Sequence, residues 1–250
     1  MKHLLHFLSL LWKTWFVVVM VITTLFYFPF VYFTIVVLKR YDWTYKIYRL
    51  WAWSIVLPLG VFPSKIVKGE IPQQQGFIFV SNHSSQMDII VPYTLLSQHF
   101  AFLAKRELTK LPLFKTNFRG MNITVDRKSM VSGLESLSEC KNKIQKHINI
   151  LIFPEGTRSK KAPAMMPFKS GAFKLAIQEQ VDIVPLVFLD NYKRLGAGKG
   201  IHKRFAGPGR SRMVVLEAIK TKGLTQKDAE SLLDKVYSEM NHCLKSYGQN

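Results

Sequence analysis

The chain has 250 residues, enough for one domain or two small ones with a sizeable core. Its formal net charge of +19 requires a polyanionic partner, either a nucleic acid or an anionic membrane surface. The two cysteines, Cys140 and Cys243, lie far apart without metal-ligand spacing, which argues against a disulfide scaffold and favours a reducing compartment.

The N-terminal region contains a long apolar run. Residues 15–38 carry no charge and are bounded by Lys13 and Lys39. As a helix this run would measure roughly 36 Å, enough to cross a hydrocarbon core of roughly 30 Å. Its length, and the lack of a small-residue cleavage site after it, argue against a secretory signal peptide. Pro29 either kinks a single spanning helix or marks the bend of a hairpin within one leaflet, and both alternatives stay open.

Positive charge is denser after this run than before it, which predicts that the bulk of the chain lies on the cytoplasmic side of a cell inner membrane or its equivalent. A second apolar stretch, residues 50–62, is too short to span and contains Trp51, Trp53 and Pro58, so we expect contact with the membrane interface. The predicted organisation is therefore a membrane-embedded or interfacial helical region at 1–62 and an α/β domain at 63–250.

Beyond residue 65, short apolar runs alternate with amphipathic helical patterns. The runs rich in Val, Ile and Phe are predicted as strands at 77–80, 100–104, 122–125, 149–153, 183–189 and 213–218. Ser129, Ser170 and the pair Thr225 and Asp228 are positioned to begin helices. This alternation predicts a mixed, largely parallel sheet covered by helices, after an N-terminal membrane-embedded helix or helical hairpin. Residues 191–212, rich in Gly, Lys and Arg, are expected to form a solvated basic loop.

The first candidate site follows the predicted strand at 77–80. His83 comes directly after Asn82, and Asp88 follows five residues later. If His83 precedes a helix and Asp88 lies in its first turns, the carboxylate can contact one ring nitrogen, fix the tautomer and leave the other nitrogen as a general base. Without a serine nucleophile, the attacking group would be a hydroxyl of the substrate. The alternative is a structural histidine that caps the helix.

The second candidate site follows the predicted strand at 149–153 and reads Phe153-Pro154-Glu155-Gly156-Thr157-Arg158-Ser159. A guanidinium in a tight, glycine-containing turn suits bidentate phosphate recognition, with Thr157 and turn amides as further donors. Glu155 would bind a substrate hydroxyl or hold the loop. The alternative is a purely structural Glu–Arg turn.

Together these two motifs resemble those of the 1-acyl-glycerol-3-phosphate acyltransferases (lysophosphatidate acyltransferases) and their wider glycerolipid acyltransferase family. The family's first motif, Asn-His-four residues-Asp, matches at Asn82, His83 and Asp88, and the third matches at every position from 153 to 159. The fourth, a short strand with Val-Pro, resembles the segment around Pro185. The second departs from the family pattern, because Met121 occupies the glycine position six residues before Arg127.

The resemblance implies an O-acyltransferase that moves an acyl group from acyl-CoA or acyl-carrier protein to the free sn-2 hydroxyl of 1-acyl-glycerol-3-phosphate, giving phosphatidate. It implies that His83 is the base and Asp88 its orienting partner. By the same resemblance Arg158 and Arg127 bind the phosphate, and Glu155 and Gly156 line the acceptor site. Lys105, at the end of the predicted strand 100–104, is a further phosphate candidate, with a solvated lysine as the alternative.

Other functions remain as alternatives. One is an acyltransferase for another lysolipid acceptor, a lyso-aminolipid or a different lysophospholipid. Another is a non-catalytic basic protein that binds anionic membrane lipids. The hydrophobic N-terminus and the lack of a recognisable nucleic-acid motif argue against a nucleic-acid partner. No cofactor or metal is expected, because no His, Cys or Asp cluster has ligand spacing.

Overall fold

The computed structural model describes residues 2–74, 76–106, 121–126, 129–196 and 206–248. The strands are β1 (Val61–Val67), β2 (Ile78–Ser81), β3 (Phe100–Lys105), β4 (Ile123–Val125), β5 (Asn149–Ile152), β6 (Ile183–Phe188) and β7 (Gly209–Val215). The helices are α1 (Lys2–Tyr32), α2 (Tyr41–Val56), α3 (Met87–Leu95), α5 (Met130–Gln145), α6 (Gly171–Glu179), α7 (Asn191–Leu195) and α8 (Ala229–Gly248). Short π and 3₁₀ segments lie at Phe33–Val37 and Gln226–Asp228.

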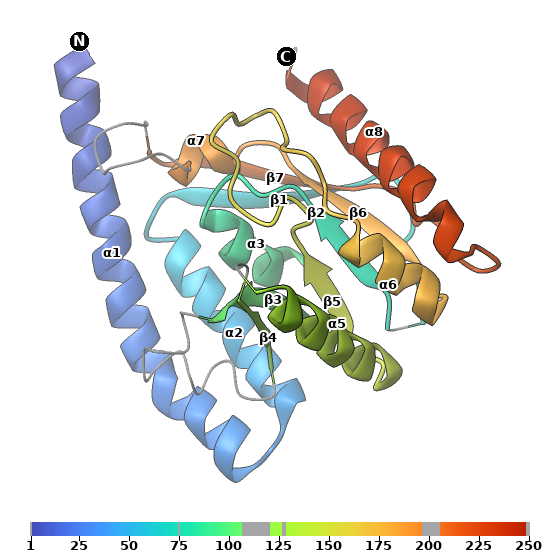
Figure 1. The fold of residues 1–250 in the computed structure, drawn as a ribbon. Helices are drawn as coiled ribbons and strands as arrows, with labels where there is room; N and C mark the ends of the chain where they lie inside the picture. Colours follow the sequence, from blue (N-terminus) through green and yellow to red (C-terminus); the bar gives the residue numbers. More distant parts are fainter. Residues whose placement is uncertain (1, 75, 107–120, 127–128, 197–205, 249–250) are drawn as a thin grey trace.

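A seven-stranded sheet in the order β1-β7-β6-β2-β5-β3-β4 forms the centre of the molecule (Figure 1). Strands β2 to β6 are mutually parallel, whereas β7 is antiparallel to β6 and parallel to β1. The predicted mixed, largely parallel sheet is therefore confirmed, and each of the predicted strands is found within a few residues of its expected position. Strand β1 was not predicted from the sequence. It is an edge strand interrupted by Pro63, where a missing N–H is tolerated, and its alternation is weak.

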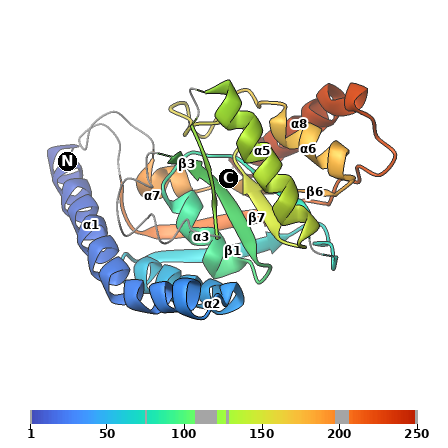
Figure 2. The same cartoon turned by 60° about the horizontal axis from the view of Figure 1, so that its bottom comes forward.

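Alternating side chains of the strands divide the core between the two faces of the sheet. In β2 and the residue before it, Phe77 and Phe79 join one cluster with α1, α2 and α3, whereas Ile78 and Val80 join a second cluster with α5, α6 and α8. Figure 2 shows the two groups of helices on either side of the sheet. Because both faces are covered, β2, β5 and β6 are buried at every position, as expected for parallel strands.

Helices α1 and α2 form an antiparallel hairpin. Near the bend the Thr44 hydroxyl donates to Thr34 Oγ1 at 2.9 Å, and near the open end Trp12 Nε1 donates to the Leu59 carbonyl at 3.0 Å. Pro29 lies inside α1, and the chain reverses only after the π segment, where Lys39 has φ 53°. The structure therefore has a hairpin, and of the two alternatives for Pro29 the one in which it marks the bend is wrong.

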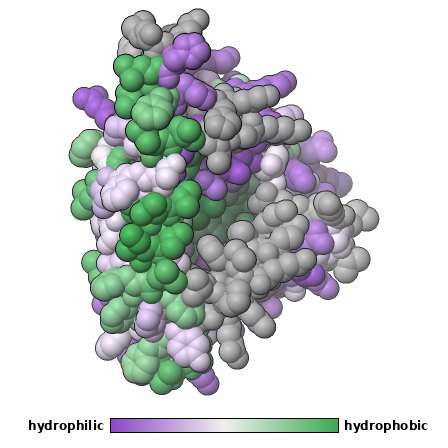
Figure 3. All heavy atoms as spheres, turned by 90° about the vertical axis from the view of Figure 1, so that its left-hand side faces the viewer, coloured by the Kyte–Doolittle hydropathy of each residue, from purple (hydrophilic) through white to green (hydrophobic). Residues whose placement is uncertain are grey.

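The outer face of α1 exposes a row of large apolar side chains along its length (Figure 3). They are Leu4, Leu5, Phe7, Leu8, Leu11, Trp15, Val17, Val18, Val21, Ile22, Leu25, Phe26 and Phe30. In the described part of the chain, one helical segment, His3–Val37, is long and apolar enough to cross a membrane. A row of this extent on a water-facing helix would be unfavourable, so it indicates contact with another apolar phase.

The interfacial contact expected for residues 50–62 stays a prediction. Leu50, Leu57 and Phe62 are exposed, whereas Ala52, Ile55 and Val56 are fully buried under the sheet. The buried apolar residues of α2 reflect its position between α1 and the sheet. The division at residue 62 stays a prediction, but β1 begins at Val61 and the hairpin shares one core cluster with the sheet.

Candidate active site

The first motif begins where β2 ends. Asn82 donates from Nδ2 to the Phe188 carbonyl at 3.0 Å and accepts the Phe188 N–H at 2.8 Å, so its amide continues the ladder between β2 and β6 in place of the backbone. The chain is thereby free to turn away from the sheet. His83 follows immediately, and Asp88 lies in the first turn of α3. The predicted arrangement of strand, turn and helix is present.

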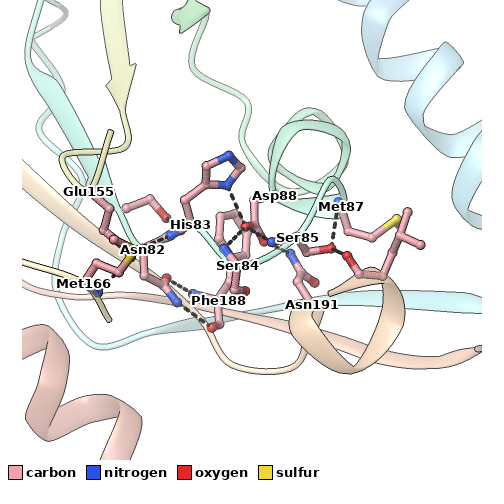
Figure 4. A network of polar contacts seen from close by, with 12 residues as sticks. Asn82, His83, Ser84, Ser85, Met87, Asp88, Glu155, Met166, Phe188 and Asn191 are labelled. Carbon is pink, nitrogen blue, oxygen red and sulfur yellow. Dashed lines mark hydrogen bonds and ion pairs between the residues drawn. The ribbon is translucent and has the colours of Figure 1, made fainter. Parts of the chain in front are cut away.

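His83 and Asp88 form a buried pair (Figure 4). His83 Nδ1 lies 3.0 Å from Asp88 Oδ2, and the two side chains are 7% and 0% exposed. The same oxygen accepts the backbone N–H groups of Ser84 at 2.6 Å and Ser85 at 2.8 Å. Since an ionised carboxylate only accepts hydrogen bonds, the ring nitrogen that faces it, Nδ1, carries a proton, and in the neutral form of the ring Nε2 presents its lone pair. The pair therefore has the geometry of an oriented general base.

The other oxygen of Asp88 contacts a residue that the sequence analysis missed. Asn191 Nδ2 donates to Oδ1 at 2.8 Å, and the Ser211 hydroxyl donates to Asn191 Oδ1. Asn191 is the first residue of α7 and is fully buried, and residues 209–212 belong to β7, so the expectation of a solvated loop at 191–212 is wrong at both of its ends. One signal was available: Asn191 follows a parallel strand next to β2, and the carboxyl ends of such strands meet at one edge of the sheet.

The second motif lies against the first because β5 is the parallel neighbour of β2. The His83 N–H donates to Glu155 Oε1 at 2.7 Å, and the Ser159 N–H donates to the His83 carbonyl at 2.7 Å. The Phe153 ring stacks on the imidazole, with centroids 4.1 Å apart and an interplanar angle of 16°. Backbone and ring contacts therefore hold the turn 153–159 in a defined position relative to the base.

Glu155 connects three segments. Its second oxygen, Oε2, accepts the Met166 N–H at 2.9 Å, and the side chain is buried. Burial, opposed by the two backbone hydrogen bonds and assisted by the charge of Asp88, raises the pKa of Glu155 to about 7. The geometry favours the alternative in which this residue holds the loop, while its predicted contact with substrate stays a prediction.

Gly156 completes this turn. It has φ 69°, and a Cβ there would come within 3.0 Å of the Lys169 side chain. A glycine therefore suits both the backbone conformation and the space available.

The remaining predicted residues differ in how far the structure describes them. Thr157 is exposed and Arg158 is half-exposed, and the described residues provide no hydrogen bond or ion pair for the guanidinium. Lys105 ends β3, paired with Val125 of β4 at the same edge of the sheet. Pro185 lies within β6 beside Val80, where it supports the sheet and not the site. Arg127 lies outside the described residues.

A cavity of about 510 Å³ adjoins the site between the ends of β3, β4 and β5 and the first turns of α5 and α6. Phe153, which stacks on His83, forms part of its wall, and the other apolar lining includes Leu103, Val125, Leu134 and Leu137. No group of three or more His, Cys, Asp or Glu side chains that could hold a metal ion occurs among the residues that the structure describes. The arrangement is thus an oriented base beside an apolar cavity and an arginine-bearing turn.

A model of the family described as Acyltransferase matches residues 65–189, half of the chain and the part that holds both motifs. The chain belongs to the acyltransferase family. The resemblance inferred from the motifs is therefore confirmed at the level of the family.

Curated relatives agree with this assignment. The chain is 34% identical over 175 residues to the 1-acyl-sn-glycerol-3-phosphate acyltransferase alpha of Mus musculus, covering 68% of this chain and 59% of that relative. It is 33% identical over 201 residues to the protein of the same name from Ovis aries, covering 78% and 67%. The chain thus spans about two thirds or less of the length of these relatives.

The fold also matches a solved structure, that of the 1-acyl-sn-glycerophosphate (LPA) acyltransferase, PlsC, from Thermotoga maritima. The TM-score is 0.78 with 24% sequence identity, and the match covers 97% of each chain. Because this coverage includes the helical hairpin, the shared fold extends over both the N-terminal helices and the sheet.

Proposed function

We propose that this member of the acyltransferase family transfers a fatty acyl group from an acyl thioester to the free sn-2 hydroxyl of 1-acyl-glycerol-3-phosphate, giving phosphatidate. The observation that carries the proposal is the buried His83–Asp88 pair, whose Nε2 meets no side-chain hydroxyl or thiol among the described residues. With no protein nucleophile beside the base, the substrate's own hydroxyl is the attacking group. The names of the mammalian relatives support the choice of acceptor.

The proton transfers follow from this geometry. His83 Nε2 takes the proton of the lysolipid hydroxyl as its oxygen attacks the thioester carbonyl carbon. The imidazolium that forms is stabilised by Asp88 through the Nδ1–H hydrogen bond of 3.0 Å. The tetrahedral intermediate then collapses, the C–S bond breaks, and the leaving thiolate receives the proton from Nε2. Overall, the acyl group moves from the thioester sulfur to the lysolipid oxygen, and the hydroxyl proton moves to the leaving thiol. The histidine returns to its starting form.

Arg158 is proposed to bind the phosphate of the acceptor. Its guanidinium is half-exposed, and its turn is tied to His83 through Ser159, so a bound phosphate would lie at a constant distance from the base. Arg127 and Lys105 stay candidates for the same role, with Thr157 and Gly156 lining the acceptor site.

The apolar cavity beside Phe153 is proposed to take an acyl chain, since its walls are largely hydrocarbon and one of them is Phe153, whose ring stacks on the imidazole of His83. The proposed donor of that chain is acyl-CoA or acyl-carrier protein.

The test is thiol release from purified protein given a palmitoyl thioester of CoA or of carrier protein, with lysophosphatidate and other lysolipids as competing acceptors. Phosphatidate formation is followed by mass spectrometry. We expect lysophosphatidate to be preferred and His83→Ala to lose about 10²- to 10⁴-fold in kcat. His242→Ala, an exposed histidine of α8, is the matched control and should keep full activity. Full turnover in His83→Ala would refute the assignment of the base, and vesicle binding without turnover would favour the non-catalytic alternative.

We further propose that α1 lies within one leaflet and does not cross the bilayer. One face of this helix of about 46 Å packs on α2 and the segment after it, through bonds such as Trp15 Nε1 to the Pro58 carbonyl and Tyr27 to Ser54, each 3.0 Å. A full crossing would draw α2 and part of the sheet into the hydrocarbon, where their polar groups would lose water. The exposed apolar row would face the lipid, with basic side chains adding about 1 kcal/mol each near anionic headgroups.

Depth measurements distinguish the two arrangements. Single cysteines at Leu4, Leu11, Ile22 and Phe30 would carry a fluorophore that is quenched by lipids labelled at known depths, because both native cysteines are buried. Similar shallow depths at the four positions are expected, whereas a passage through the bilayer centre would refute the proposal. The cytoplasmic placement of the sheet domain stays a prediction.

A further inference from the structure

Asn191 contacts the oxygen of Asp88 that does not face the imidazole (Figure 4). We propose that Asn191 is a positioning residue of the reaction, which holds the plane of the Asp88 carboxylate so that Oδ2 stays directed at His83 Nδ1. This inference rests on the proposed function of the His83–Asp88 pair. It adds a third residue, from a different part of the chain, to the two that the first motif supplies.

The hydrogen bonds around Asp88 explain why a third contact matters. Oδ2 accepts three donors, the imidazole and two backbone N–H groups, at 2.6 to 3.0 Å. These bonds fix the position of one oxygen, but a carboxylate held at one oxygen can still rotate about it. The bond from Asn191 Nδ2 to Oδ1 fixes the second oxygen and hence the plane. The direction of the Oδ2 lone pairs toward the ring follows from that plane.

The orientation of the Asn191 amide is itself determined. A carboxylate cannot donate, so the NH₂ group must face Asp88 and the amide oxygen must face Ser211, whose hydroxyl then donates. Asn191 and Ser211 are both fully buried, and no alternative solvent partner reaches them. The carboxylate therefore sets the orientation of the amide, and the Ser211 hydroxyl from β7 satisfies the amide oxygen that faces away from it.

The segment that carries Asn191 is held on both sides. The residue before it, Asp190, forms a bidentate pair with Arg212 at 2.7 and 2.9 Å. At the other end of α7, the Ser85 hydroxyl donates to the Leu195 carbonyl at 2.7 Å. Because these contacts join α7 to β7 and to the loop after His83, Asn191 approaches Asp88 from a rigid support.

The experiment compares Asn191→Ala with Asn149→Ala in the full-length protein. Asn149 is an equally buried asparagine at the start of β5, where it bonds Gly76 and His99 at the opposite ends of the strands from the site. We expect Asn191→Ala to lower kcat about 10- to 100-fold per folded molecule, with the KM of both substrates within about twofold. Asn149→Ala should lose stability with kcat per folded molecule nearly unchanged. Equal kcat values for the two variants would overturn the proposal.

Two further measurements keep the test decisive. In Asn191→Asp the introduced carboxyl can donate a hydrogen bond to Asp88 only while it is protonated. The ratio of the kcat of this variant to that of the wild type should therefore fall as the pH rises. A ratio that does not depend on pH contradicts the proposal. If Asn191→Ala does not fold, Ser211→Ala serves in its place, because it removes the hydroxyl that bonds the Asn191 amide. This variant should lose less than the 10- to 100-fold in kcat expected of Asn191→Ala. Full activity of Ser211→Ala would contradict the proposal.

One readout does not depend on catalysis. The Nδ1 proton of His83, identified by its loss in His83→Ala, should give a downfield NMR resonance that shifts in Asn191→Ala and not in Asn149→Ala. No shift would overturn the positioning role even if the protein lacked the proposed activity. Absence of thiol release from the wild type, with the shift present, would instead refute only the proposed function.

Discussion

Replacing Asp88 by asparagine removes the charge of the dyad while leaving a partner for each hydrogen bond around it. The carboxylate accepts His83 and two backbone N–H groups on Oδ2, and Asn191 on Oδ1. If the new amide oxygen takes the place of Oδ2, its NH₂ group faces Asn191. That side chain can turn over and accept, because the Ser211 hydroxyl is able to accept in its turn. Asp88→Asn should therefore keep the fold and the tautomer of His83.

The free energies of unfolding and the kcat values of two Asp88 variants distinguish the effect of the charge from the effect of the hydrogen bonds. Asp88→Ala leaves four buried donors without an acceptor, at about 1–3 kcal/mol each, so the free energy of unfolding should fall by at least about 4 kcal/mol. Asp88→Asn exchanges charge-assisted for neutral hydrogen bonds and should lose only about 1–2 kcal/mol. Its kcat should nevertheless fall about 10²- to 10⁴-fold, because the imidazolium formed during proton transfer has lost its counter-charge.

Chemical denaturation in detergent and initial rates of thiol release measure the two effects on the same samples. The reasoning is refuted if Asp88→Asn retains kcat within about threefold of the wild type, since the charge would then be dispensable. It is also refuted if Asp88→Asn is as unstable as Asp88→Ala, since the rearranged hydrogen bonds would not form.

Three other predictions follow from the site. Arg158→Lys removes the bidentate geometry of the guanidinium and should raise the KM for lysophosphatidate about tenfold, while the KM for the acyl donor stays unchanged. Equal changes in the two KM values would contradict phosphate binding by Arg158. Gly133 lines the cavity, and a Cβ added there meets nothing within 4 Å, so the side chain of Gly133→Leu has room to occupy the cavity. In a series of donors of different acyl-chain length, this variant should therefore prefer shorter chains than the wild type. An unchanged preference would place the acyl chain elsewhere. The pKa of Glu155 in the folded state is about 7, above its ordinary value of 4.5, so folding is coupled to binding of a proton at this carboxyl. The resulting contribution to the free energy of unfolding is up to about 3 kcal/mol. It is fully present below pH 4.5 and is lost as the pH rises to 7. Urea unfolding should show this decline in the wild type and not in Glu155→Gln, and identical profiles would argue against the raised pKa.

The sheet was predictable because buried parallel strands are continuous apolar runs, which stand out in the sequence whatever packs against them. The edge strand β1 lacks that signal, since Pro63 and Lys65 interrupt it, and only its pairing with β7 defines it. The apolar run at 15–38 predicted that the N-terminus contacts an apolar phase, but it did not distinguish a kinked span from a hairpin. That choice depended on the packing of α1 against α2, and the bend lies near Lys39, ten residues beyond Pro29.

The sequence by itself determined which side chains carry the proposed chemistry, because His83 and Asp88 are only five residues apart and a single turn and helix start bring them together. It also identified the turn 153–159 by its composition. The tertiary structure alone decided how these parts are held: Glu155 bonds His83 across 72 residues and Asn191 bonds Asp88 across 103. Such contacts depend on the order and direction of the strands in the sheet, which local spacing does not specify.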